Sequence, residues 1–107
     1  MIKIDIKPLS VNEAWQGKRF KTKEYERYEK SILILLPKIN IPSKPYCLTI
    51  EFRFSSRKSD IDNPLKPLID ILQKKYAIDD KDINKLIVEK KLVKKGEESI
   101  LFQLDRF

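Results

Sequence analysis

The feature that most constrains the fold is a run of alternating side chains at residues 46–54. Large apolar residues take every second position of this run and smaller or charged residues take the others: Tyr46, Leu48, Ile50, Phe52 and Phe54 alternate with Cys47, Thr49, Glu51 and Arg53. Because successive side chains of a strand point to opposite faces, this period predicts a β-strand with one buried face. A sheet with one buried face needs a second layer to cover it.

Three further strands are expected from the same kind of pattern. Isoleucine alternates with charged residues over positions 2–7, which predicts a half-buried strand at the start of the chain, and a loop over residues 8–21 follows. Apolar and β-branched residues predict strands at about 85–93 and 99–104, joined by a turn that contains a glycine.

Two helices provide the covering layer. Thr22 is suited to cap a helix over residues 23–36, which a proline ends. Asn63 is suited to cap a second helix with Pro64 in its first position, and its apolar residues recur at helical spacing until about Lys75. The expected order is β-α-β-α-β-β, an α+β fold with a mixed sheet and two helices in a single domain over residues 1–107.

Composition excludes several kinds of site. The 107 residues include no histidine, one cysteine (Cys47) and two glycines (Gly17 and Gly96). The chain therefore has no histidine base or histidine ligand, no internal disulfide and no cysteine cage for a metal. Two isolated glycines also exclude a glycine-rich nucleotide loop, so no nucleotide cofactor is expected. Any metal that this chain binds must have oxygen ligands.

The charge balance favours an anionic partner. Lysine and arginine number 23 against 16 acidic residues, which gives a formal net charge of +7. Such an excess suits nucleic acid, although a basic composition without such a partner is an equal alternative at this point. No apolar run approaches the ~20 residues of a membrane span, and the first residues lack the apolar segment of a signal peptide. We therefore expect a cytoplasmic protein with no membrane partner.

Charged side chains gather around the start of the second helix. Asp60 and Asp62 are separated by one residue, so in an extended segment they would point to the same face. Lys66 and Asp70 are one helical turn apart and share a helix face. The turn that follows the helix could bring Asp80 to the same place.

These residue types suit metal-assisted chemistry on phosphate. Clustered carboxylates repel one another unless a cation compensates, and Mg²⁺ does so with oxygen ligands, water and substrate phosphate. With Lys66 beside it, such a site is suited to phosphodiester hydrolysis, in which the lysine stabilises the transition state or orients the nucleophile. The alternative is that Asp60 and Asp62 only form a turn and cap a helix, while residues 79–82 form a solvated turn.

The chain resembles the RusA-type Holliday junction resolvases in several segments. The central likeness is DIDNPLK at residues 60–66, followed by Asp70 and by IDD at residues 78–80. PLSVN at residues 8–12 and the basic GKR at residues 17–19 also resemble this family. The likeness spans nearly the whole chain.

The resemblance implies a function and a set of site residues. Mg²⁺ or Mn²⁺ would be bound by Asp60, Asp62 and Asp80, and Lys66 would be a catalytic lysine. The DNA contacts expected from the resemblance and from the basic loop are Arg57, Lys58, Lys18, Arg19 and Asn12. The partner would be a four-way DNA junction, in recombination or repair, and the active form would be a homodimer. Many members of the family come from bacteriophages.

Two other functions stay open at this stage. One is a broader branched-DNA or restriction-like nuclease that uses Asp70, Glu89 and Lys91. The other is a non-catalytic, basic DNA-binding protein whose acidic cluster is only a turn. The lysines near the predicted hairpin are expected to be solvated: Lys90, Lys91, Lys94 and Lys95.

Overall fold

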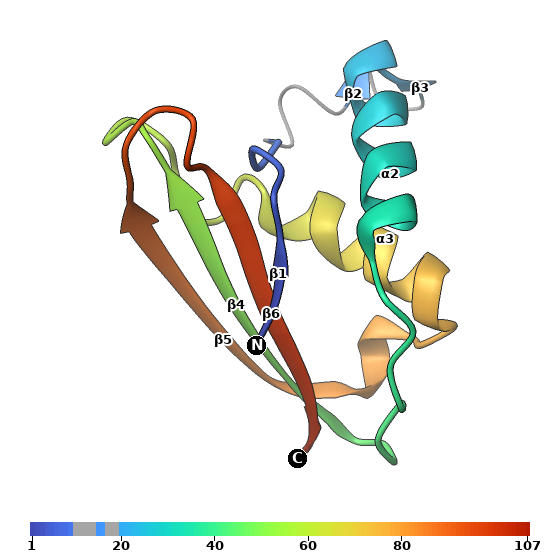
Figure 1. Ribbon diagram of the computed structural model, residues 1–107. Coiled ribbons are helices and arrows are strands. Elements are labelled where there is room, and N and C mark those ends of the chain that lie inside the picture. Colours follow the sequence, from blue (N-terminus) through green and yellow to red (C-terminus); the bar gives the residue numbers. More distant parts are fainter. Residues whose placement is uncertain (10–14, 17–19) are drawn as a thin grey trace.

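The computed structural model of the chain describes residues 1–9, 15–16 and 20–107 (Figure 1). The elements, in chain order, are β1 (Ile2–Ile4), β2 (Trp15–Gln16), β3 (Phe20–Lys21), α2 (Lys23–Leu35), β4 (Tyr46–Phe54), α3 (Leu65–Tyr76), the 3-10 turn η1 (Asp80–Asp82), β5 (Ile83–Leu92) and β6 (Ser99–Arg106).

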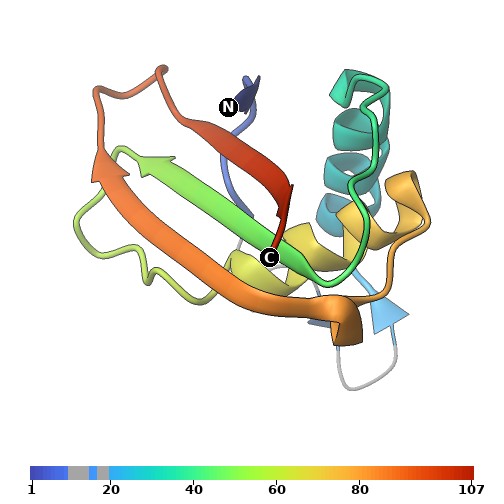
Figure 2. The ribbon, with the colours of Figure 1, turned by 90° about the horizontal axis from the view of Figure 1, so that it is seen from below.

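The main sheet has four strands in the order β1-β6-β4-β5. β4 pairs in parallel with β5, whereas the other neighbours are antiparallel, so the sheet is mixed. Figures 1 and 2 show α2 and α3 on the same side of this sheet. The α+β fold and its expected order are confirmed, and the short β2 and β3 pair adds to it within the segment expected to be a loop.

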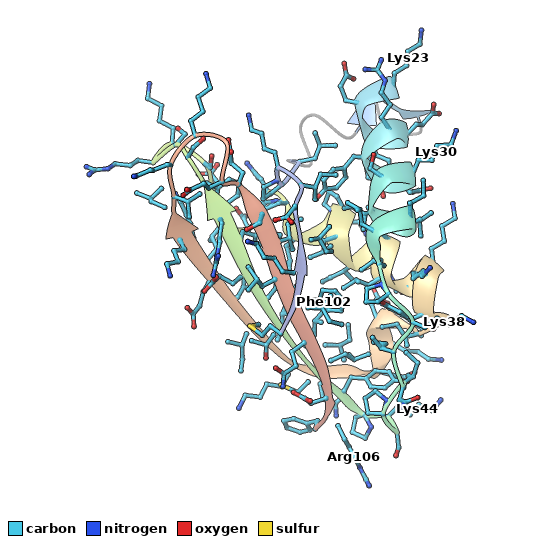
Figure 3. The ribbon with its side chains drawn as sticks, viewed as in Figure 1. Lys23, Lys30, Lys38, Lys44, Phe102 and Arg106 are labelled. Atoms are coloured by element: carbon cyan, nitrogen blue, oxygen red, sulfur yellow. The ribbon has the colours of Figure 1, made fainter. Side chains whose placement is uncertain are left out.

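The core lies between the sheet and the two helices. Ile50 and Phe52 of β4 are fully buried, as are Leu68 and Ile71 of α3 and Phe102 of β6. Figure 3 shows Phe102 on the side of the sheet that faces the helices. The predicted alternation in β4 is confirmed, because its buried and half-buried residues alternate over all nine positions.

The first helix begins as its sequence predicts. Thr22 lies in extended backbone, and its hydroxyl accepts a hydrogen bond from the Tyr25 N–H at 3.1 Å. The apolar residues at the end of this helix differ in burial, because Ile32 is fully buried while Ile34 is 79% exposed. Neither helix in the part of the chain that the structure describes is long and apolar enough to cross a membrane.

The second helix starts one residue later than predicted. α3 begins at Leu65, and Pro64 rather than Asn63 takes the cap position, without a side-chain cap. The Asn63 amide is used elsewhere, since it donates to the Asp60 carboxylate at 3.1 Å. The helix ends at Tyr76, one residue beyond the predicted end, and Ala77 follows in the left-handed region with φ of 53°.

The parallel pairing of β4 with β5 determines where the candidate site residues lie. Tyr46 pairs with Ile83 at one end of the two strands, and Phe54 pairs with Leu92 at the other. The loop that leaves β4 therefore lies at one end of the sheet, and η1, which leads into β5, lies at the opposite end. α3 connects these two ends of the sheet (Figures 1 and 2).

Candidate active site

The loop between β4 and α3 carries the first two candidate ligands, Asp60 and Asp62. β4 ends at Phe54, and residues 61–64 form a bend and a turn. The backbone bends at residues 61 and 62 and turns at residues 63 and 64 before it enters α3, so the extended segment expected around Asp60 and Asp62 does not form. The Asp62 carbonyl accepts the Leu65 N–H at 3.1 Å, which joins this turn to the helix. Both aspartates are exposed.

Lys66 and Asp70 lie on one face of α3, as helical spacing predicts. The Lys66 ammonium is 3.5 Å from Oδ1 of Asp70, and the two side chains are 67% and 31% exposed. An exposed pair of this kind contributes little to stability, about 0.3–0.5 kcal/mol. Its importance here is positional, because it holds an ammonium in the first turn of α3, close in sequence to Asp60 and Asp62.

Gln73 links this helix face to the turn that carries Asp80. Its amide nitrogen lies 3.4 Å from Oδ1 of Asp70, and its amide oxygen accepts the backbone N–H of Asp80 at 2.9 Å. Hydrogen bonds thus connect Lys66, Asp70, Gln73 and the Asp80 backbone. No sequence pattern indicated a role for Gln73, since its contact with Asp80 depends on how the chain leaves α3.

The neighbouring carboxylates affect ionisation around this face. Burial raises the pKa of the Tyr25 hydroxyl, and the Glu29 and Asp70 carboxylates raise this pKa further. In η1, the Lys81 N–H donates to the Asp79 carboxylate at 3.1 Å, and this hydrogen bond lowers the pKa of Asp79. Asp79 therefore caps η1, and Asp80 next to it keeps an exposed carboxylate.

A hollow of about 240 Å³ lies beside Asp60. It is lined by Lys7, Pro8, Phe54, Lys58, Ser59, Asp60, Asn63 and Pro64. Lysines from two distant parts of the chain, Lys7 and Lys58, thus flank a carboxylate, an arrangement that can accept a phosphate group close to a carboxylate-bound cation. The sequence pattern indicates no role for Lys7 beyond a polar position in the predicted first strand.

The donor chemistry of the candidate ligands fits Mg²⁺ or Mn²⁺. Asp60, Asp62 and Asp80 offer exposed carboxylates, the oxygen ligands that these ions prefer. Within the described part of the chain, however, no three acidic or cysteine side chains are close enough together to hold an ion. The topology explains this, because Asp60 and Asp62 precede α3 at one end of the sheet and Asp80 precedes β5 at the other.

The expected DNA contacts fall in two groups. Arg57 and Lys58 are exposed in the loop that leads to Asp60. Asn12, Lys18 and Arg19 lie outside the described residues.

The restriction-like alternative does not agree with the geometry. Glu89 and Lys91 of β5 pair with Glu51 and Arg53, the residues of β4 that alternate with its buried ones. They therefore point to the face of the sheet opposite the helices, whereas Asp70 belongs to α3, on the helical side. These three residues do not form one site.

Lys90 is not solvated as predicted for the lysines near this hairpin. It pairs with the fully buried Phe52 and so points to the helical side of the sheet. Its ammonium donates to the carbonyl oxygens of Arg57, at 3.1 Å, and of Ser59. The other three lysines of that group, Lys91, Lys94 and Lys95, are exposed as expected.

Comparison with known proteins identifies the family of the chain. No curated protein matches the sequence. The family model described as endodeoxyribonuclease RusA matches residues 7–100 of the 107. This match covers the loop that leaves β4, all of α3 and η1, and therefore every candidate ligand together with Lys66. The chain belongs to the RusA family of endodeoxyribonucleases.

Proposed function

We propose that this endonuclease resolves four-way DNA junctions by paired, Mg²⁺-dependent hydrolysis of phosphodiester bonds. The observation that carries the proposal is the start of α3, where exposed Asp60 and Asp62 precede the paired Lys66 and Asp70 in a chain of a DNA endonuclease family. The position supports chemistry on a large substrate, because these groups lie on the surface and a DNA backbone can reach them.

Asp60, Asp62 and Asp80 would hold the metal. When bound, Mg²⁺ or Mn²⁺ would supply Lewis-acid stabilisation of the phosphate and a more acidic water. Lys66 lies in the first turn of α3, four residues after Asp62, and it stabilises the negative charge that develops on the phosphate in the transition state. Asp70 orients the Lys66 side chain through their ion pair at 3.5 Å.

The basic residues around the Asp60 hollow would hold the DNA. Lys7 and Lys58 line the hollow, and Arg57 is exposed next to Lys58. Contacts of lysine and arginine with phosphates position a duplex without reading its sequence, and they weaken as salt increases. Such contacts suit an enzyme that recognises the shape of a branched substrate.

A homodimer would provide the two incisions that resolution requires. A four-way junction has approximate two-fold symmetry, and a two-fold dimer offers two sites in a matching arrangement. The separation of Asp80 from Asp60 and Asp62 within one chain supports a stronger form of this proposal. We infer that Asp80 of one subunit completes the ligand set formed by Asp60 and Asp62 of the other.

The test is a nicking assay on a synthetic four-way junction, with linear duplex and flap DNA as comparisons, in the presence and absence of Mg²⁺. We expect Mg²⁺-dependent, paired cuts in the junction and little cutting of linear duplex. Equal cutting of all substrates would indicate a general nuclease. Binding without cutting at any Mg²⁺ or Mn²⁺ concentration would indicate a DNA-binding protein and contradict the proposal.

The matched variant is Asp62→Asn, which removes one metal-binding charge and keeps the size of the side chain. We expect it to abolish cutting and to leave junction binding intact or tighter, because repulsion of the phosphates decreases while the basic surface remains. Asp60→Asn and Asp80→Asn should behave alike. Cutting by Asp62→Asn at the wild-type rate would show that the ligand assignment is wrong.

A further inference from the structure

Lys90 is the one charged side chain of β5 that the described structure connects to the loop before Asp60. It lies far from this loop in sequence, 33 residues from Arg57 and 31 from Ser59. It pairs with the buried Phe52 and so points to the helical side of the sheet. The loop leaves β4 at this end of the sheet and leads to α3 (Figures 1 and 2).

The ammonium of Lys90 makes three contacts there. It donates to the Arg57 carbonyl at 3.1 Å and to the Ser59 carbonyl, and it lies 6.0 Å from the centre of the Phe54 ring, over its face. An ammonium has three donors, so two backbone carbonyls can be served at once, and the aromatic face adds a favourable contact for the cation. Lys90 therefore joins the end of β4 to both sides of Lys58.

These contacts hold in place a loop that has few other long-range contacts. Ser55, Ser56, Arg57 and Lys58 are all exposed, so packing does little to fix the loop. Ser55, at the start of the loop, donates through its hydroxyl to the Glu98 carboxylate at 2.9 Å. After Ser55 the other described bonds are local, from Ser59 N–H to the Ser56 carbonyl at 3.4 Å and from Lys58 N–H to the Ser56 hydroxyl at 3.2 Å. Among the described hydrogen bonds, those from Lys90 are the ones that tie residues 57–59 to the sheet.

We propose that Lys90 is a positioning residue, which holds the loop of Arg57, Lys58 and Ser59 so that Asp60 is placed for metal binding. The role in metal binding rests on the proposed function, whereas the role in holding the loop does not. Ser59, whose carbonyl Lys90 binds, directly precedes Asp60, so a change in the loop moves the backbone of that ligand. Lys90 itself touches neither metal nor DNA in this assignment.

The first measurement is limited proteolysis of the full chain by trypsin, with the cut sites identified by mass spectrometry. Trypsin attacks the carbonyl of Arg57, and Lys90 donates to that same oxygen. Lys90→Met keeps an unbranched side chain, one atom shorter, and removes its donors. We expect it to speed cutting after Arg57 and Lys58 by about tenfold, as local opening becomes easier. Lys90→Arg, which can still donate to two carbonyls, should stay near the wild-type rate.

Two controls separate this effect from general loss of stability. Lys91→Met changes the neighbouring exposed lysine on the other face of the sheet, and it should leave the rate unchanged. Cutting after Lys95, in the turn before β6, serves as the internal reference. An equal rise at both places in Lys90→Met, or no rise after Arg57, overturns the proposal.

The second measurement is the affinity for Mn²⁺, followed by electron paramagnetic resonance of the free ion. We expect Lys90→Met to weaken binding several-fold and Lys90→Arg to restore it, with binding of junction DNA without metal little changed. Unchanged Mn²⁺ affinity in a variant whose loop is cut faster would show that Lys90 holds the loop but not the ligand, which contradicts the positioning role. A wild-type chain that binds no Mn²⁺ would instead contradict the proposed function, and the proteolysis result would stand alone.

Discussion

At the scale of single residues, Lys66 separates catalysis from binding most clearly. It is held by Asp70 on an exposed face of α3, so its removal should not disturb the core. We expect Lys66→Ala to lower the rate of junction cutting by about a hundredfold or more, because charge on the transition state loses its stabilising partner. The measurement is single-turnover cutting at saturating junction, with binding followed separately.

Lys66→Arg is the matched variant for this prediction. Its guanidinium keeps the charge but has a different shape, so recovery should be partial. If the defect of Lys66→Ala disappears at saturating DNA, the lysine contributes only to binding.

Gln73 gives a second prediction at this scale. Gln73→Leu removes both the hydrogen bond to Asp70 and the one to the Asp80 backbone, while its volume stays similar. We expect the Mg²⁺ concentration for half-maximal cutting to rise several-fold, because the turn that carries Asp80 loses its tie to α3. Junction binding should not change.

The neighbouring residue provides the control for Gln73. Lys74 pairs with Glu29 of α2 at 2.7 Å, away from the Asp80 turn. Lys74→Met should reduce stability slightly and leave the Mg²⁺ requirement as it is. The role of Gln73 is contradicted if the two variants show the same change in Mg²⁺ requirement.

Site residues could be predicted where their contacts join residues close together in the sequence, and not where the contacts join distant ones. The pair of Lys66 and Asp70 follows from helical spacing alone and is confirmed. The contacts of Gln73 with the Asp80 backbone and of Lys90 with the loop depend on how α3 and β5 pack, and no local pattern carries that information. Alternation on a strand does not show which face the rest of the chain covers, and the sequence alone therefore predicts a solvated Lys90.

At the scale of elements, local patterns predicted most of the secondary structure. The alternation of β4 and the cap at Thr22 are confirmed because burial and hydrogen bonding there involve near neighbours. β5 begins at Ile83, earlier than predicted, because Ile83 pairs with Tyr46 of the parallel strand. The start of α3 was missed because the Asn63 amide bonds to Asp60 instead of capping the helix.

The packing of α2 leads to a prediction about pH. Tyr28 is 6% exposed, and burial raises its pKa above the ordinary value of 10.0. Above pH 10 the unfolded chain releases this proton while the folded chain keeps it, so the unfolded state binds fewer protons and the free energy of unfolding falls as pH rises. One such group contributes a slope of up to about 1.4 kcal/mol per pH unit.

The measurement is thermal or denaturant unfolding between about pH 8 and 11. Tyr28→Phe lacks the ionisable hydroxyl, so we expect its stability to fall less steeply above pH 10 than that of the wild type. Deprotonation of lysines affects both proteins alike and cancels in the comparison. Parallel curves would show that the hydroxyl ionises as easily in the folded chain as in the unfolded one.

At the scale of the whole molecule, the question is how two incisions arise from a chain with one set of candidate ligands. A mixture of wild type and Asp62→Asn tests the homodimer, because hybrid dimers should nick one strand without resolving the junction. Light scattering at micromolar concentration gives the mass of the active species. A strictly monomeric species with full resolving activity would contradict the dimer.

Mixing two inactive variants tests whether the ligand set is shared between subunits. In a hybrid of Asp62→Asn with Asp80→Asn, a shared arrangement leaves one site intact, because the Asp80→Asn subunit keeps Asp62 and its partner keeps Asp80. The other site then carries both substitutions. If each chain formed its own site, every site in the hybrid would carry one substitution and none would cut.

We therefore expect the mixture to regain nicking of one strand, while each variant alone stays inactive. A mixture that forms hybrids and remains inactive would place all three carboxylates in one subunit, and the chain would then have to bring η1 to the start of α3 on binding metal.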